Sequence, residues 1–270
     1  MRPGRLARAL PAMLVIGWKD AVAYRSEFVV WMLTMTLPLI MLALFRAVAA
    51  EGMVGAYDGP AFTAYFLATL VVRQLASSWT VWEINREVRE GTLAMRLLRP
   101  IHPLWSYLCE SLAAQPFRVL FSVPFALVLL YTIDGSGAAR VARDPATLAL
   151  FAASLALAYA ISFAISSLVG ALALYFESAL GLWHIYIGLY ALLSGYLVPL
   201  ALFPGWLRRV ASLTPFPYAQ AVPVEILLGQ HAPRAALRLV ATQALYAGVA
   251  VAVLLLVWRH AQKRFAAYGG

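Results

Sequence analysis

The sequence contains little charge and almost no cysteine or lysine. Charged residues make up 12% of its 270 residues, hydrophobic residues make up 63%, and the mean hydropathy is +0.79. A soluble domain typically has about 25% charged and roughly 45–50% apolar residues. The composition therefore excludes an ordinary soluble enzyme and indicates an integral membrane protein. The single cysteine, Cys109, excludes an intramolecular disulfide and a cysteine-rich metal site.

Several catalytic motifs are also missing. Lys19 and Lys263 are the only lysines, and neither stands in the Gly-x-x-x-x-Gly-Lys-Ser/Thr sequence of a phosphate loop. The nearest match to an intramembrane serine protease, Leu192-Leu193-Ser194-Gly195, lacks the first glycine. The four histidines are scattered without metal-ligand spacing, and the arginines are not gathered into a stripe with aromatics. We therefore expect no catalytic residue, no metal, no cofactor in this chain and no nucleic-acid partner.

Six apolar segments are long enough to cross a hydrocarbon core of about 30 Å, which takes roughly 20 helical residues. They are Phe28–Phe45, Ala61–Trp82, Leu104–Tyr131, Thr147–Leu174, Leu180–Phe203 and Leu239–Trp258. The sequence therefore predicts an all-helical (all-α) integral membrane protein in which residues 1–270 form one transmembrane domain.

The basic residues are shared unevenly between the two sides of the membrane. Six spans place both termini on one side, and twelve lysines and arginines fall on that side against six on the other. The positive-inside rule therefore predicts that both termini are cytoplasmic. The N-terminal residues 1–26 resemble a signal peptide, but Lys19 and Asp20 interrupt the apolar run where cleavage would be prepared. Their two-faced pattern favours an uncleaved helix lying in the membrane interface.

An island of charge, residues 83–100, separates the second and third apolar segments. Its sequence, EINREVREGTLAMRLLRP, holds seven charged residues in 18. These charges must lie in water, so we expect a short cytoplasmic helix held against the membrane face. The simpler alternative is that the charges only solvate a loop.

A proline-rich segment, residues 204–233, precedes the last span. Pro204, Pro215, Pro217 and Pro223 divide it into pieces too short to cross a membrane. We expect short re-entrant helices that enter the outer leaflet and cap the spans from outside, because irregular backbone at that depth must pack on protein or line a cavity. An ordinary surface loop is the alternative.

Polar residues inside the predicted spans mark a possible translocation path, since an intramembrane charge is expensive and by default indicates function. The candidates are Arg73, Gln74, Ser77, Glu110, Arg118 and His184. Three roles remain open for Arg73: an ion pair with Glu110, lining the substrate path, or reaching a lipid headgroup.

The order of these segments resembles a known family. It is similar to the type-2 exporter permeases of ATP-binding-cassette (ABC) transporters, in particular a bacterial branch whose ATPase is a separate subunit. The resemblance covers nearly the whole chain and includes the pattern Ile84-x-x-Glu87-x-x-x-Gly91-Thr92-Leu93 followed by Leu97-Leu98-Arg99-Pro100. It implies an exporter permease of the bacterial cytoplasmic (inner) membrane, acting as a dimer with a second copy or a related permease.

The resemblance also implies how energy enters the membrane domain. In this family the cytoplasmic helix after span two docks on the ATPase, so residues 83–100 would be a coupling helix. The matching contact residues are Arg86, Glu87, Arg89, Glu90, Gly91, Thr92 and Leu93, with Glu177 at a second, smaller contact between spans four and five. Two cytoplasmic ABC ATPase subunits would bind ATP and Mg, and membrane lipids would surround the spans.

A secondary transporter, or another polytopic membrane protein without an ATPase partner, is the main rival hypothesis. It would predict an inverted repeat with broken helices at the membrane midplane. The sequence shows no clear repeat between its two halves. Whether an ATPase subunit accompanies the purified protein discriminates between the two.

Overall fold

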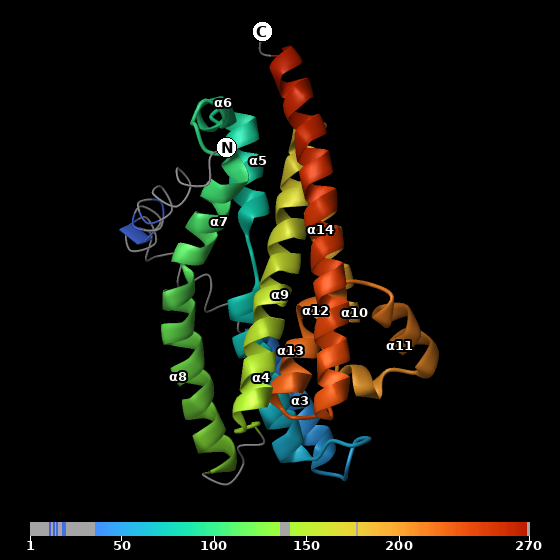
Figure 1. Cartoon of the computed structure of the whole chain (residues 1–270). Helices are drawn as coiled ribbons and strands as arrows, with labels where there is room; N and C mark the ends of the chain where they lie inside the picture. The colour runs from blue at the N-terminus through green and yellow to red at the C-terminus, as the bar shows by residue number, and fades with distance from the viewer. Residues whose placement is uncertain are drawn as a thin grey trace.

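The computed structural model describes residues 11, 13, 15, 18, 19, 36–135, 141–176 and 178–268 (Figure 1). Most of the predicted interfacial helix 1–26, the first part of the predicted first span and Glu177 lie outside the described residues. The five described positions before residue 36 are helical.

The described residues form helices joined by short connections, as an all-α fold predicts. The helices are α3 (Thr36–Ala49), α4 (Gly59–Ala76), α5 (Thr80–Glu90), α6 (Leu93–Leu97), α7 (Pro103–Ala113), α8 (Gln115–Asp134), α9 (Pro145–Ala171), η1 (Leu172–Leu174), α10 (Leu180–Leu193), η2 (Leu200–Leu202), α11 (Gly205–Ser212), α12 (Phe216–Ala219), α13 (Ala221–Leu227) and α14 (Pro233–Tyr268). Asp58 and Asp144 each accept a backbone N–H at the start of a helix, α4 and α9 respectively, with a proline in its first turn. This is the expected chemistry of a helix N-terminus.

Three helical stretches among the described residues are long and apolar enough to cross a membrane. They are Pro103–Asp134, Pro145–Leu174 and Pro233–Lys263. Thr36–Ala49 and Leu180–Leu193 are shorter apolar helices. The structure is thus compatible with a multi-pass membrane protein, and the count of six spans stays a prediction.

Two predicted spans are interrupted. The segment Ala61–Trp82 ends as a helix at Ala76 and resumes at Thr80. Ser77 is extended, and the Ser78 hydroxyl lies 2.8 Å from that of Thr80. The predicted third span consists of α7 and α8, which meet at Ala114, just before the helix-breaking Pro116.

Helix α9 is the centre of the molecule. It packs along α14, while α5, α4, α13, α12 and α10 contact its other sides, and α8 lies against α4 (Figure 1). A buried amide fixes the main contact, because Gln243 of α14 donates to the Ser154 carbonyl and accepts from the Ser154 hydroxyl, each at 2.8 Å. Such bonds satisfy polar groups that a membrane cannot hydrate.

The proline-rich segment forms three short helices, α11, α12 and α13. Helices α12 and α13 are buried between α9, α4 and α14, whereas α11 is largely exposed. Gln220, between α12 and α13, donates to the Thr69 carbonyl of α4 at 3.0 Å and accepts from the Tyr190 hydroxyl of α10 at 2.6 Å. The segment therefore joins α4 to α10.

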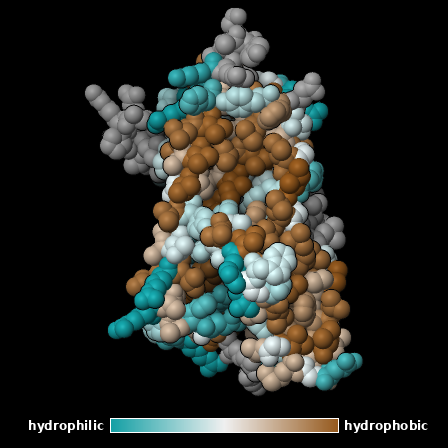
Figure 2. Space-filling view, turned by 90° about the vertical axis from the view of Figure 1, so that its right-hand side faces the viewer, coloured by the Kyte–Doolittle hydropathy of each residue, from teal (hydrophilic) through white to brown (hydrophobic). Residues whose placement is uncertain are grey.

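Figure 2 shows the face of the molecule that carries α11 and α14. A broad hydrophobic area occupies its upper half below a hydrophilic end, and hydrophilic side chains interrupt the surface lower down. Exposed apolar residues along α14, among them Leu245, Val249 and Leu256, belong to a surface suited to lipid.

Candidate functional site

The charged island lies at one end of the molecule, beside the C-terminal part of α14 (Figure 1). The island consists of the larger part of α5 together with α6, and not of one short helix over residues 83–100. Helix α5 continues roughly in the direction of α4 (Figure 1). Gly91 ends α5 in the left-handed conformation, with φ of 74°, which only glycine adopts without strain. The chain then turns back through α6.

Arg96 of α6 holds the island together. Its Nε lies 2.9 Å from both carboxylate oxygens of Glu87 on α5, and its Nη1 lies 2.7 Å from Oε1 of Glu110 on α7. The guanidinium also lies over the ring of Tyr107, 4.2 Å from its centroid, and the Tyr107 hydroxyl donates to Glu87. One arginine therefore joins three helices.

The pKa of Arg96 reflects this arrangement. Burial opposes its charge, but hydrogen bonds to Glu87 and Glu110 outweigh burial and raise the pKa further above its ordinary value. Arg86 at the surface behaves more simply, since its hydrogen bond to Glu83 raises its pKa. Arg96 is therefore a permanent cation inside a largely closed site.

The predicted contact residues divide into two groups. Exposed residues form an outer surface of the island: Arg86, Arg89, Glu90, Gly91 and Thr92. Met95 and Leu98, which are 68% and 80% exposed, add apolar area to it. Glu87 and Leu93 are instead buried, at 7% and 1% exposure, so they position the island from within.

Two contacts fix α5 to its neighbours. The Asn85 side chain accepts the backbone N–H of Ala179 at 3.0 Å, which links α5 to the start of α10. On the opposite helix α9, a Cβ added at Gly170 would lie 2.9 Å from the Cβ of Ile84. Close approach of α5 and α9 therefore depends on glycine at position 170.

The interruption between α4 and α5 is stabilised by side chains of α8. Arg118 donates to the Ser77 carbonyl at 2.7 Å and to the Gln74 carbonyl at 3.3 Å, and Gln115 donates to the Leu75 carbonyl at 3.2 Å. Val81 at the start of α5 donates to the Ser166 hydroxyl of α9. Carbonyls left without helical partners are thus satisfied by fixed side chains.

Arg73 lies among aromatic rings. Its guanidinium is 4.6 Å from the ring centroid of Tyr190, 5.7 Å from that of Tyr196 and 5.9 Å from that of Trp79. These distances are within the range of cation–π attraction. The possible ion pair of Arg73 with Glu110 is not formed in the structure, because among the described residues the Glu110 carboxylate pairs with Arg96.

The remaining predicted path residues come from the end of α4, from α10 and from α7. Gln74 and Ser77 are buried at the interruption, where Arg118 binds their carbonyls. His184 is exposed on α10 and meets the Trp82 ring edge-on, with centroids 6.2 Å apart. Glu110 belongs to the Arg96 cluster rather than to this group.

The sequence did not single out Arg96, Tyr107 or Asn85 as functional residues. Arg96 is nine residues from Glu87, a separation that has no meaning within one helix and arises only when α6 folds back on α5. A signal that could have indicated it is the unequal distribution of charge, since acidic residues occur only in the first half of the island.

A family model described as "ABC-2 family transporter protein" matches residues 30–269. No curated protein matches the chain.

Proposed function

Because this chain belongs to the ABC-2 family of transporter proteins, we propose that it is the permease of an ATP-driven exporter whose ATPase is a separate subunit. In this proposal two permeases, identical or related, pair in the bacterial inner membrane with their termini in the cytoplasm. Two ATPase subunits bind ATP and Mg and dock on the island. The chain itself contributes no catalytic residue.

The observation that carries the proposal is the outer surface of the island. Arg86, Arg89 and Glu90 present both signs of charge, and Met95 beside them is 68% exposed. Mixed charges fix the orientation and register of a partner, while an exposed apolar side chain can anchor it. Because Arg96 binds both Glu87 of α5 and Glu110 of α7, a partner that displaces the outer surface would move α5 and α7 together.

The contacts that connect α5 to α4 and α8 support coupling of the island to the spans. Helix α5 continues through the interruption at Ser77 into α4, which carries Arg73. Because Arg118 and Gln115 hold the interruption from α8, a displacement of α5 is passed to both α4 and α8. We propose that this displacement opens and closes a path lined by Arg73, Gln74, Ser77 and His184, with Arg118 as the residue that positions the interruption.

The first experiment is purification of the tagged full chain from its native membrane, with mass identification of bound subunits. An ABC ATPase is expected in the complex. The double variant Arg89→Glu with Glu90→Arg should weaken ATPase binding by about tenfold, which corresponds to about 1.4 kcal/mol, because it reverses the charge pattern without touching a buried residue.

Arg234→Glu serves as the matched control, since it reverses an exposed charge at the start of α14, the end of the molecule away from the island. It should bind the ATPase as the unchanged protein does. A protein that transports without any ATPase, or an Arg89/Glu90 variant that binds it normally, would contradict the proposal. The first of these results would favour a secondary transporter.

The role of Arg73 requires its own test, with ATP hydrolysis by the reconstituted complex as the readout. Arg73→Lys keeps the charge but not the planar group that stacks on Tyr190, whereas Tyr190→Phe keeps the ring. We expect Arg73→Lys to uncouple hydrolysis from transport and Tyr190→Phe to retain the coupling. The reverse order would remove Arg73 from the path.

A further inference from the structure

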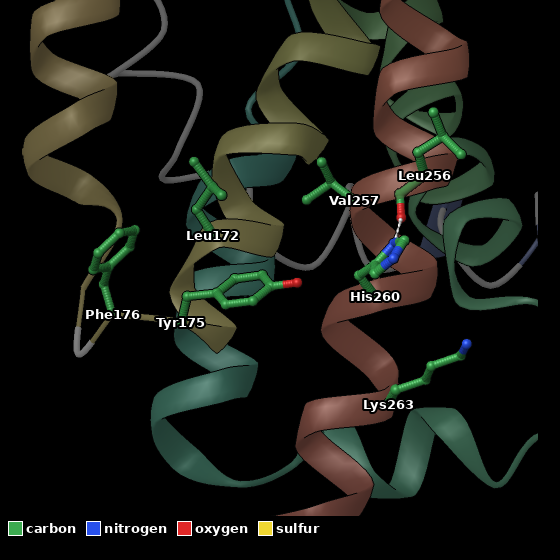
Figure 3. Close-up of a pocket in the computed structure, with 7 residues that line it drawn as sticks. All are labelled: Leu172, Tyr175, Phe176, Leu256, Val257, His260 and Lys263. Carbon is green, nitrogen blue, oxygen red and sulfur yellow. Dashed lines mark hydrogen bonds between the residues drawn. The ribbon is translucent and has the colours of Figure 1, made fainter.

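A groove of about 650 Å³ lies between the end of α9 and the C-terminal part of α14 (Figure 3). Leu172 and Tyr175 form one wall, and Leu256, Val257, His260 and Lys263 of α14 form the other. In Figure 3 the Tyr175 hydroxyl points toward α14, and the two basic residues follow the two apolar ones along the helix. The groove is therefore apolar at one end and basic at the other.

The geometry points to a resident anionic phospholipid in this groove, with an acyl chain on the apolar end and the phosphate at Lys263. This inference does not rest on transport or on an ATPase partner. It requires only that α14 lies in a membrane.

The position of the groove along α14 supports a lipid rather than a soluble ligand. Val249 and Leu256, two turns apart, are 54% and 56% exposed, as expected for side chains in contact with acyl chains. His260 and Lys263 follow within the next two turns and are also exposed. The change from apolar to basic marks the level of the headgroups, so a molecule in the groove would span that boundary.

The charge of the groove supports an anionic headgroup. Among the described residues Lys263 has no ion pair with an acidic side chain, and a lysine ammonium group binds phosphate as a point charge. His260 holds its Nδ1 2.9 Å from the Leu256 carbonyl. Because a carbonyl only accepts, Nδ1 carries the proton in this hydrogen bond.

The apolar part of the groove matches a hydrocarbon chain. Phe176 at the turn after α9 is 57% exposed, and Leu172 is half-buried beside it. Their exposure in water would be unfavourable by about 25 cal/mol for each Å² of apolar surface. A lipid tail covers this surface, whereas an inorganic phosphate or a soluble nucleotide would leave it exposed. Basic pockets between helices at a membrane face suit anionic headgroups because the charges are opposite.

The test uses the full chain reconstituted in nanodiscs of phosphatidylcholine with phosphatidylglycerol as the anionic probe, followed by native mass spectrometry of retained lipid. The unchanged protein should retain phosphatidylglycerol in preference to phosphatidylcholine. Lys263→Glu should reduce this retention by at least about fivefold, since it replaces one favourable surface charge with a repulsive one.

Two matched controls separate the site from general effects. Arg238→Glu reverses an exposed charge near the other end of the same helix and should leave retention unchanged. Leu256→Asn should reduce retention, because it places a polar group where the tail lies, whereas Val249→Asn, two turns away, should not.

The inference is overturned if phosphatidylcholine is retained as well as phosphatidylglycerol, or if Lys263→Glu and Arg238→Glu have equal effects. It is also overturned if Lys263→Glu leaves lipid retention intact but weakens binding of a soluble protein subunit, which would make the groove a protein-docking surface. Thermal unfolding of each variant in the same nanodiscs shows that the loss of lipid is not a loss of folding.

Discussion

Arg96 Nε lies equally close to the two carboxylate oxygens of Glu87, at 2.9 Å from each. Their side chains are each about 10% exposed. The geometry is that of a planar donor facing a planar acceptor, which lysine could not reproduce. The pair lies inside the island, whereas Arg86, Arg89 and Glu90 are exposed charges at its surface.

Replacing Arg96 should therefore destabilise the protein strongly. Arg96→Gln leaves the Glu87 carboxylate buried beside Tyr107 without its cation, at a cost of about 3 kcal/mol. The free energy of unfolding, measured by SDS titration in mixed micelles, checks this.

Arg86→Gln is the control for that measurement. Arg86 also pairs with a glutamate, Glu83, at 2.6 Å, but its side chain is 59% exposed, and exposed pairs contribute less than about 1 kcal/mol. Equal losses for the two variants would show that the Arg96 cluster is not closed to water.

A second prediction concerns the contact between α5 and α9. Gly170→Ala should cost about 1–3 kcal/mol, because its new Cβ would lie 2.9 Å from the Cβ of Ile84 and the two helices would have to separate. Gly188→Ala adds the same methyl group on α10, where no heavy atom lies within 4 Å, and should be neutral or stabilising. Unfolding temperatures of the two variants provide the comparison, and a neutral Gly170→Ala would disprove the tight contact.

The interruption between α4 and α5 gives a third prediction. Arg118→Met removes the donor for the Ser77 and Gln74 carbonyls, and buried acceptors left without partners cost about 1–3 kcal/mol. Gln115→Met removes a single donor, to Leu75, and should cost less. Hydrogen exchange should rise at the amides of Ser77–Val81 in the Arg118 variant. Unchanged hydrogen exchange at these amides would mean that the ends of α4 and α5 are stable without Arg118.

The fourth prediction is a pH dependence at the segment between α13 and α14. His231 Nε2 lies 2.8 Å from Glu225 Oε2, and this hydrogen bond raises the pKa of His231 despite partial burial. Because the folded-state pKa is the higher one, the contribution to stability is complete below about pH 6.5 and is lost as pH rises through the raised value. The unfolding temperature should fall more between about pH 5.5 and 8.5 in the unchanged protein than in His231→Gln. Parallel profiles would remove the pair from the stability of the fold.

The sequence predicted the coarse organisation of the fold, because hydropathy alone identifies apolar helices and the composition is too apolar for a soluble domain. It predicted an interrupted proline-rich segment before the last helix for a clear reason, since proline cannot continue a helix. It did not predict the interruption at Ser77 within an apolar run. Serine is tolerated inside helices, and the loss of helix here depends on Arg118, which is distant in sequence.

The candidate site was less predictable for a related reason. Charge in the island predicted exposure, and Arg86, Arg89 and Glu90 are exposed. Glu87 belongs to the same run but is buried, because α6 returns across it and brings Arg96. The pairing of Glu110 followed the same rule: its partner was decided by the fold of α6, which local sequence does not encode.

The hydrogen bond from Ala179 to Asn85 has a consequence for how variants should combine. It connects the start of α10 to α5, so we expect a displacement of either segment to move the other as well. Effects of substitutions in the two segments should then fail to add, since each acts on the same rigid piece. Replacing Asn85 with a side chain of equal size that lacks the acceptor oxygen would remove this connection, and the two segments should then move independently.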